Sequence, residues 1–355
     1  MTPAETARPV AAEGAQQRLD ASHLEEALAV LRDVSVAVDG GRTWITVRNA
    51  LAAAPAPGVN PRLATIERDL IRVLSVVTNP AASATYLGDG LVFLPTSLGL
   101  PLIGFADDLQ ITPSLLMQRK WDEPTTRLLE RIIRPGDRFL DVGANIGYFT
   151  VFGAALAGGT GHVHAFEPNP RTHDVLTRNV RMNNFGHVCT LHQSALGDRT
   201  GTATIHTFVR NQGGSTLSTL PDHLLDEWHE RPVDCTVPLT TLDTVFADRD
   251  DVFSCIKMDA EGSEAMIWAG AARFFHEHVN DRTIILLEWN PPALAGSGAD
   301  PRALLATFAQ HGFSVWRRDD QLALTSITDV GQLDHRCNCE LLLARDPARV
   351  AEVCR

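Results

Sequence analysis

The strongest chemical signal in the sequence is a run of glycines beside an acidic residue, Asp141-Val-Gly143-Ala-Asn-Ile-Gly147. An apolar, strand-like segment precedes this run and a helical pattern follows it. A doubly wound sheet binds its nucleotide at such a strand-to-helix turn, and glycine lets the backbone approach a ligand closely. Because the glycines are spaced GxxxG and not GxGxxG, we favour an amino-acid-bearing ligand over a pyrophosphate.

A second acid stands at the corresponding place after the next predicted strand. Glu167 follows the apolar segment 162–166 and lies 26 residues after Asp141. A carboxylate at this position can accept both hydroxyls of a ribose, and Asp141 is placed to hold a cationic α-amino group. A turn cap for Asp141 and a helix-start acid for Glu167 are the structural alternatives. We prefer a ligand role for both, which predicts a pocket for an adenosyl amino acid.

With these motifs the sequence resembles the class I S-adenosylmethionine-dependent methyltransferases, and within them the FkbM-like family. The resemblance covers about residues 85–345. The combination of DVGANIG with KxDxEGxE is more specific than either motif alone. The matching segments are Trp121–Pro124, Asp141–Gly147, Phe166–Pro168, Ser194–Asp198, Thr241–Asp243 and Ile256–Glu264.

The resemblance implies S-adenosylmethionine as the cofactor. It also implies methyl transfer, most often to a hydroxyl of a sugar, polyketide, peptide or other secondary metabolite. Ser194 and Ala195 would flank the adenine. Together, the residues and the resemblance assign ten positions to the cofactor: Asp141, Gly143, Ala144, Asn145, Gly147, Glu167, Pro168, Asn169, Ser194 and Ala195.

Methyl transfer from a sulfonium is an in-line displacement, in which positioning alone can supply ~7–11 kcal/mol. Removing the proton from an alkyl hydroxyl should add a factor of ~10²–10⁴. The groups that do this must lie at the carboxyl ends of the strands, beside the cofactor. Asp259 and Glu288 end two predicted strands, and Glu261 follows closely. We therefore predict Asp259, Glu261 and Glu288 as the catalytic residues.

A divalent ion is the alternative use of these acids. Catechol-type methyltransferases are similar in placing acids and an asparagine at such strand ends, where this sequence has Asp259, Glu288 and Asn290. The spacing differs, so Mg²⁺ is not favoured and no residue is assigned as a metal ligand. Glu264 is better explained as an acid in the first turn of a helix, and for Glu261 that explanation and a functional one weigh about equally.

Alternating strand and helix patterns follow residue 122. Continuous apolar strands, such as Ile284–Leu287, are typical of a parallel sheet covered on both faces. We predict an α/β fold, a doubly wound seven-stranded class I methyltransferase (Rossmann-like) sheet. The predicted strands are 138–142, 162–166, 189–195, 253–258, 283–288, 313–317 and 340–344, and the helices are 147–157, 171–184, 262–275 and 301–311.

Two further parts of the chain lie outside this alternation. Residues 202–208 and 210–237 form an insertion, which is a candidate substrate lid. Before the sheet we predict a disordered N-terminus (1–20), a mainly helical region (21–84) with helices from about 22 to 34, over 43–54 and from 61, and a connecting strand and turn segment (85–121). The methyltransferase domain then spans 122–348. The helical region could serve in dimerisation, as a lid or in docking.

The composition restricts the partners. The 355 residues include 43 acidic and 31 basic side chains, giving a net charge of −12, which argues against nucleic acid as a partner. The sequence has neither a signal peptide nor an apolar run of ~18 residues, so we expect a cytoplasmic protein without a membrane partner. The expected acceptor is a small molecule, or one linked to a carrier or glycan. A homodimer is one option for an oligomeric state that the sequence leaves open.

Three functions from different classes stay open. The first is O-methylation of a hydroxyl on a small molecule or on a glycosylated, polyketide or peptide secondary metabolite. The second is N- or C-methylation of a peptide by the same fold. The third is a non-catalytic binding protein, which should show eroded motifs, whereas both acids and both glycines are intact. Asn290-Pro-Pro292 follows the fifth strand, the wrong place for recognition of a flipped base.

Overall fold

The computed structural model describes residues 84–218, 225, 230–319, 323–333 and 338–354, and the backbone of 34–39 and 42–47. The chain divides into two compact units, 1–82 and 83–355. In the described residues no helix is long and apolar enough to cross a bilayer.

The first unit contains a hairpin of β1 (Val34–Asp39) and β2 (Arg42–Val47), which pair antiparallel from Val34 opposite Val47 to Asp39 opposite Arg42. We expected helix around residue 34 and over 43–54, and the prediction was wrong for these strands. Valine occupies every second position of β1 up to Val38, β2 is rich in threonine, tryptophan, isoleucine and valine, and Gly40-Gly41 separates the two strands, which is a hairpin signal. The predicted disorder at 1–20 and the rest of the predicted helices lie outside the described residues.

The second unit opens with three short strands in an antiparallel sheet, in the order β3-β4-β5. These are β3 (Thr85–Gly88), β4 (Leu91–Leu94) and β5 (Leu102–Phe105). Short strands and turns were expected here, whereas the helix α3 (Ile111–Gln118) that follows was not.

The main element is an eight-stranded sheet in the order β15-β14-β16-β13-β12-β6-β7-β8. β8, β7, β6, β12 and β13 are parallel, and β16 runs antiparallel to β13 and β14. The predicted doubly wound class is confirmed, with one more strand than expected. The strands are β6 (Arg138–Val142), β7 (His162–Phe166), β8 (Cys189–His192), β12 (Cys255–Met258), β13 (Ile284–Trp289), β14 (Ser314–Arg318), β15 (Leu324–Ile327) and β16 (Cys339–Ala344).

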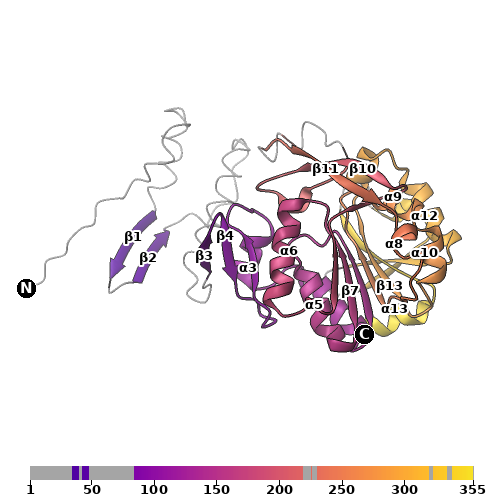
Figure 1. The fold of residues 1–355 in the computed structure, drawn as a ribbon, viewed down its shortest axis with the longest axis horizontal. Helices are drawn as coiled ribbons and strands as arrows, with labels where there is room; N and C mark the ends of the chain where they lie inside the picture. The colour runs from indigo at the N-terminus through magenta and orange to yellow at the C-terminus, as the bar shows by residue number, and fades with distance from the viewer. Residues whose placement is uncertain are drawn as a thin grey trace, which may run out of the picture. The chain divides into compact units, whose positions relative to one another are not determined.

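Helices cover both faces of this sheet, as Figure 1 shows for α5 and α6 on one side and α9, α10 and α12 on the other. The first face packs against α4 (Glu123–Ile132), α5 (Tyr148–Ala157), α6 (Pro170–Met182) and α13 (Pro347–Val353). The second packs against α8 (Leu242–Val245), α9 (Glu264–Ala269), α10 (Ala272–Glu277), α11 (Pro291–Gly296) and α12 (Pro301–Gln310). Short 3₁₀ turns cover Gly158–Thr160, Gln212–Gly214 and Val330–Gln332.

Local sequence explains where many of these helices begin. Four of them, α6, α11, α12 and α13, start with Asn or Asp as the N-cap followed directly by proline. The cap side chain satisfies a free N–H of the first turn, and proline fits where no N–H is needed. The single helix predicted over 262–275 is two helices, because the chain turns at Gly270, where a Cβ would lie 2.0 Å from the carbonyl oxygen of Gly197.

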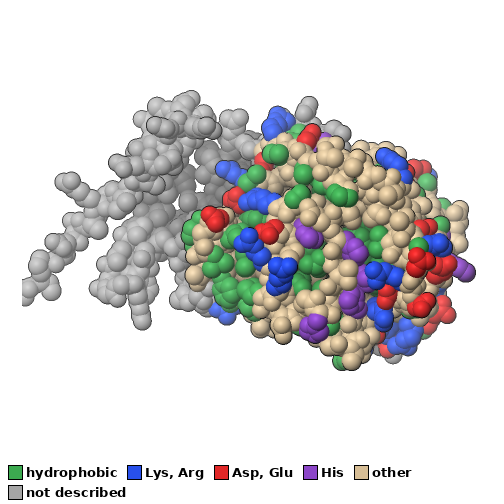
Figure 2. All heavy atoms as spheres, in the orientation of Figure 1, with side chains coloured by type: hydrophobic (Ala, Val, Ile, Leu, Met, Phe, Trp, Pro, Cys, Tyr) green, Lys and Arg blue, Asp and Glu red, His purple; other side chains and the backbone are tan. Residues whose placement is uncertain are grey.

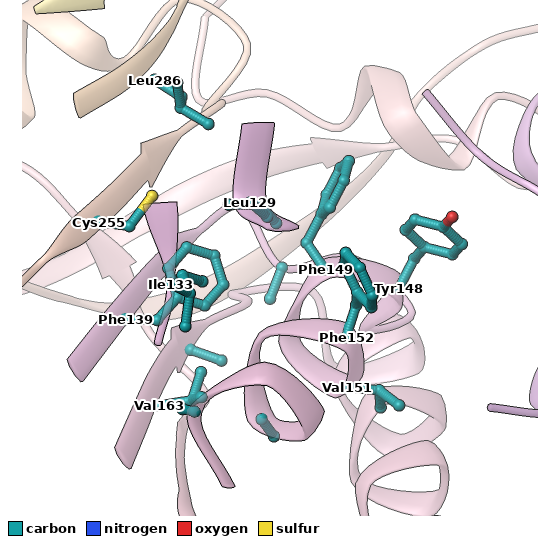
Figure 3. Close-up of a cluster of buried hydrophobic side chains, with 14 of the residues drawn as sticks. Leu129, Ile133, Phe139, Tyr148, Phe149, Val151, Phe152, Val163, Cys255 and Leu286 are labelled. Carbon is teal, nitrogen blue, oxygen red and sulfur yellow. The ribbon is translucent and has the colours of Figure 1, made fainter. Parts of the chain in front are cut away.

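The core on the first face holds α5 close to the sheet. Figure 3 shows Phe139 of β6 beside Cys255, Ile133 and Val163, and each large side chain of this kind contributes about 1.5–3 kcal/mol on burial. Gly153 of α5 lies against Phe139, where a Cβ would be 2.4 Å from the ring. This close packing fixes the start of α5, and with it the loop that joins β6 to α5.

The predicted insertion begins where the chain leaves the central sheet. The strand expected over 189–195 ends at His192, and β9 (Ala195–Leu196) belongs to a second sheet. That sheet contains β10 (Gly201–Thr207) and β11 (Val233–Thr240) in the order β10-β11-β9. Residues 219–224 and 226–229 lie outside the described ranges, so a lid in 210–237 stays a prediction.

Candidate active site

The predicted acids meet at one edge of the sheet because the strands that carry them are parallel. Asp141 of β6 lies opposite Lys257 of β12, and Lys257 lies opposite Leu286 of β13. Glu167 directly follows β7, the neighbour of β6 on its other side. The carboxyl ends of these four strands form the rim where α/β sheets bind ligands.

The glycine loop after β6 is pressed against the neighbouring strand ends. Gly143 has φ +76°, and a Cβ there would lie 1.7 Å from the carbonyl oxygen of Asp259, so no other residue fits. The N–H groups of Gly143 and Ala144 both donate to the carbonyl of Phe166, at 3.0 and 2.9 Å. The loop is therefore anchored to β7 on one side and touches the end of β12 on the other.

Asn145 and Gly147 complete the turn into α5. Both have positive φ, +50° and +90°, a conformation open to glycine and tolerated by asparagine. A Cβ on Gly147 would lie 2.5 Å from Cδ1 of Leu176, so the glycine lets α5 begin against α6. Gly143, Asn145 and Gly147 of the predicted motif thus form the loop between β6 and α5. Their contact with a cofactor stays a prediction.

Glu167 is held by backbone groups on both sides. Its Oε2 accepts from the N–H of Asn145 at 2.8 Å and its Oε1 from the N–H of Asn169 at 2.9 Å. Glu167 is 6% exposed. Burial raises the pKa of its carboxyl group to about 7, although these two hydrogen bonds act to lower it. Each oxygen keeps a second lone pair, so the carboxylate can still accept two ligand hydroxyls. Pro168 joins Glu167 to Asn169 in the chain, and the side chain of Asn169 caps α6.

Asp141 lies beneath the loop with its side chain fully buried. Its Oδ2 accepts from the hydroxyl of Thr150 at 2.6 Å, and its Oδ1 lies 3.8 Å from Nζ of Lys257. Burial raises the pKa of Asp141, and Lys257 and Thr150 oppose that effect. Direct contact with an α-amino group stays a prediction. Lys257 and Thr150 were not singled out from the sequence, although Lys257 lies within the KxDxEGxE motif.

Ser194 and Ala195 lie at the start of the second sheet. Ala195 is 4% exposed and packs its side chain against Ile205, Val237 and Leu239, while Ser194 is half-buried between β8 and β9. Any contact of Ala195 with adenine would therefore use its backbone. Nearby, the ring of His192 stacks on Phe166 with centroids 4.2 Å apart, and burial lowers the pKa of His192 to about 4, so this ring is neutral near pH 7.

The three predicted catalytic acids lie together. One carboxylate oxygen from each of Asp259, Glu261 and Glu288 lies within 4.8 Å of the others. Asp259 is the most open, with its side chain 42% exposed, and its Oδ2 lies 3.0 Å from Nζ of Lys257. Burial and the neighbouring acids raise the pKa of Glu261 and of Glu288 well above the usual range. The cluster can therefore hold a proton near neutral pH.

The other acids and amides near this cluster have structural partners. Glu264 is fully buried and its Oε1 accepts from the N–H groups of Ala260 and Gly262, at 2.9 and 3.4 Å. Asn290 caps α11 by accepting from the N–H of Ala293 at 3.2 Å. The side-chain oxygen of Asn290 is thus used within the chain, and Glu261 takes the third place beside Asp259 and Glu288. An acidic cluster does not by itself identify a metal.

A pocket of about 230 Å³ adjoins this cluster, with Asp259 and Glu288 in its wall. Beyond them it is lined by four polar residues that were not assigned to the site from the sequence: Asp122, Arg318, Asn338 and Glu340. Asp122 lies within the matching segment Trp121–Pro124. For Arg318 and Glu340 the signal is their position, at the end of β14 and near the start of β16, at the same edge as the predicted acids.

On the face that Figure 2 presents, basic and acidic side chains of the described residues are interspersed and form no large patch of one charge. The expectation that nucleic acid and membrane are not partners stays a prediction, as does the oligomeric state.

Comparison with known proteins identifies the domain. Residues 141–315 match a family model described as "Methyltransferase FkbM domain". Among curated proteins no significant match was found.

Several solved structures are similar to this chain at low sequence identity and low TM-score. An O-methyltransferase from Thermotoga maritima is 9% identical, with 75% of this chain and 86% of that chain covered and a TM-score of 0.36. The O-methyltransferase TomG from Streptomyces achromogenes, solved with SAM, is 14% identical, with 62% of this chain and 78% of that chain covered and a TM-score of 0.34. A ribosomal protein L11 methylase from Lactobacillus delbrueckii subsp. bulgaricus is 10% identical, with 63% of this chain and 77% of that chain covered and a TM-score of 0.33. At these scores the neighbours do not identify an acceptor.

Proposed function

Because residues 141–315 belong to the FkbM methyltransferase family, this chain is an S-adenosylmethionine-dependent methyltransferase, and we propose that it methylates a hydroxyl oxygen. The acceptor is a small molecule, or a hydroxyl of a glycosylated, polyketide or peptide secondary metabolite. A cytoplasmic location and an acceptor presented free or on a carrier or glycan belong to the same proposal.

The observation that carries the proposal is the division of the sheet edge into two halves. The glycine loop and Glu167 occupy the ends of β6 and β7, and the acid cluster with its pocket occupies the ends of β12 and β13. Gly143 and Asp259 are in direct backbone contact where the halves meet. This arrangement supports a role for Glu167 in binding the ribose and a role for Asp259 as the proton acceptor beside it.

The first half fits the cofactor. Glu167 is oriented by two backbone N–H groups and retains acceptor capacity for two hydroxyls. Asn145 and the glycines on either side of it shape the loop around the ligand. When bound, S-adenosylmethionine supplies a methyl group on a sulfonium, which is a good leaving group.

In the second half, Asp259 is the group that takes the proton from the acceptor hydroxyl. Lys257 holds one of its oxygens at 3.0 Å, which leaves the exposed side of the carboxylate toward the pocket. Burial lowers the pKa of Lys257, but Asp259 and Asp141 outweigh it and the net pKa is raised. The lysine therefore stays charged and fixes Asp259. Glu261 and Glu288 lie beside Asp259, and their raised pKa favours the protonated form, so Asp259 is the member of the cluster left to accept the proton.

The test is calorimetric titration of the protein with S-adenosylmethionine and S-adenosylhomocysteine, followed by mass spectrometry of candidate acceptors. Binding of both ligands and a methyl group mapped to oxygen would support the proposal. A methyl group mapped to nitrogen or carbon would replace it with the corresponding activity. Failure to bind either ligand, alone or with acceptor present, would remove it.

The pH dependence of cofactor affinity gives an independent prediction. Glu167 has a pKa of about 7 in the free protein because of burial, and ribose hydroxyls donate to its ionised form. Affinity for S-adenosylhomocysteine should therefore fall as the pH decreases through 7, by roughly tenfold between pH 8 and pH 6. Titration calorimetry across this range measures it. The Glu167→Gln variant should lose this dependence, and a wild-type affinity that is flat with pH would contradict the role of Glu167.

A further inference from the structure

A row of four ionisable side chains crosses the sheet edge at the acid cluster: Asp259, Glu288, Glu340 and Arg318. The strand register places them in one row. Two residues further from the rim on each strand, Lys257, Leu286, Leu342 and Trp316 lie opposite one another, and side chains two residues apart on a strand point to the same face. All four ionisable side chains line the pocket.

Arg318 is held in place but only partly bonded. Its Nη2 pairs with Oε2 of Glu340, and both oxygens of Glu340 also accept from the hydroxyl of Thr125, at 3.1 and 3.2 Å. The side chain of Arg318 is 7% exposed. Its Nε and Nη1 are buried without a hydrogen-bond partner in the described part of the chain. Buried donors are unfavourable when nothing accepts from them, so the pocket offers these two to a ligand.

Glu288 offers the complementary group in the same pocket. Its Oε1 accepts from Nδ2 of Asn338 at 2.6 Å, which fixes the carboxyl group. Its Oε2 is buried and has no partner among the described residues. Fixed donors on Arg318 and a fixed oxygen on Glu288 therefore line one pocket.

The charges of the wall decide which ligand fits. Both cations are already paired with acids, Lys257 with Asp259 and Arg318 with Glu340. Asp122 adds a further acid, whereas the raised pKa of Glu288 favours its uncharged form. An anionic ligand would find no unpaired cation in this wall, and an apolar ligand would leave the arginine donors unpaired. A hydroxyl both accepts and donates, and so satisfies both kinds of group.

The size of the pocket limits how much of the ligand it takes. At about 230 Å³ it lies below the roughly 300–1,000 Å³ of pockets that enclose drug-sized molecules. It suits one small ring or a short polyol and not a whole large acceptor.

We propose that Arg318 and Glu288 bind an uncharged, hydroxyl-rich part of the acceptor, such as a vicinal diol of a sugar-like ring, beside Asp259. Hydroxyl oxygens accept from Nε and Nη1 of Arg318, and Oε2 of Glu288, whose carboxyl group Asn338 orients, forms a hydrogen bond with a ligand hydroxyl. Arg318 is thus a specificity residue of the acceptor site. This assignment rests on the proposed function for the statement that the pocket holds the acceptor.

Three probes with the same ring separate the ligand classes: methyl α-D-glucopyranoside, glucuronate and glucosamine. Each is titrated into the ¹⁵N-labelled full chain, without and with saturating S-adenosylhomocysteine, and the arginine Nε–H resonances are followed. The resonance missing from Arg318→Lys identifies Arg318. We expect the uncharged glycoside to shift it and to bind about tenfold more tightly than glucuronate.

Variants test the residue itself. Arg318→Lys keeps the charge beside Glu340 but loses the forked donors, and should weaken glycoside binding about tenfold. Arg317→Lys, on the opposite face of β14, is the matched control and should bind as the wild type does. If Arg318→Lys folds poorly, the double variant Arg318→Met/Glu340→Met removes the pair together with its desolvation cost and should not bind the glycoside.

The outcomes distinguish this inference from the proposed function. Tighter binding of glucuronate or of glucosamine, or no binding of any probe, would overturn the hydroxyl assignment, as would wild-type glycoside binding by both Arg318 variants. S-adenosylhomocysteine should bind the wild type and every variant. Its failure to bind would count against the proposed function, whereas bound S-adenosylhomocysteine without bound glycoside would count against the inference alone.

Discussion

The Asp259→Asn variant is expected to lose about 10²- to 10⁴-fold in turnover, the range that a positioned general base supplies. Asparagine has nearly the same shape and can still accept from Lys257, which lies 3.0 Å from the present carboxylate. It cannot take a proton from a hydroxyl. The loss should appear in kcat measured with the acceptor found by mass spectrometry, while affinity for S-adenosylhomocysteine should change by less than about threefold, since the substitution removes no ligand of the cofactor half.

Asp174→Asn is the matched control for this variant. Asp174 lies on α6 with its side chain 58% exposed and pairs with Arg178, and it does not line the pocket, so turnover of the Asp174→Asn variant should equal that of the wild type. Equal losses of turnover and of cofactor affinity in Asp259→Asn would make Asp259 a cofactor residue. Unchanged turnover would pass the role of base to Glu261 or Glu288.

The Glu167→Ala variant is expected to lose most of the cofactor affinity. Two hydrogen bonds to a charged group contribute about 1.5–3 kcal/mol each, so the loss should be roughly 10²- to 10⁴-fold in Kd for S-adenosylhomocysteine. The chain should still unfold in one cooperative transition, because the pairing of β6 with β7 and β12 does not involve this side chain. Calorimetry and thermal unfolding measure the two effects separately.

Two variants interpret the result. Glu167→Gln keeps an acceptor for the N–H of Asn145 or Asn169, so an intermediate affinity would divide the loss between the loop and the ribose. Glu130→Ala, an exposed acid on α4, controls for the change in charge. Wild-type affinity in Glu167→Ala would remove the basis of the cofactor site.

The parts of the fold that could be predicted from the sequence are those with a dense local pattern. The run Ile284–Leu287 is apolar throughout because β13 is buried on both faces, and such a run indicates a strand in the middle of a parallel sheet. β15, with the sequence Leu-Thr-Ser-Ile, is an edge strand whose one neighbour among the described strands is β14, and its four residues are too few to show a clear periodicity. The start of β1 was mistaken for helix because Val34 continues the three-residue spacing of Leu28 and Leu31.

The site divides in the same way. Asp141, Gly143 and Glu167 belong to local motifs, so the amino-acid sequence alone is enough to predict that they lie near one another. Arg318 and Asn338 carry no motif and reach the pocket through the register of distant strands. Asn338 lies 50 residues from the Glu288 that it contacts, and that distance in sequence leaves no pattern to find.

The contact between Gly143 and Asp259 also makes the two half-sites mechanically continuous. A missing side chain brings the loop against the carbonyl of Asp259, and the N–H of Asp259 is bonded to Val142 just before the loop. Under the proposed function, movement of the loop on cofactor binding would displace the end of β12, which carries Asp259. We therefore expect binding at the two half-sites to be coupled, and linkage requires that coupling to be reciprocal: the factor by which cofactor alters acceptor affinity is the factor by which acceptor alters cofactor affinity.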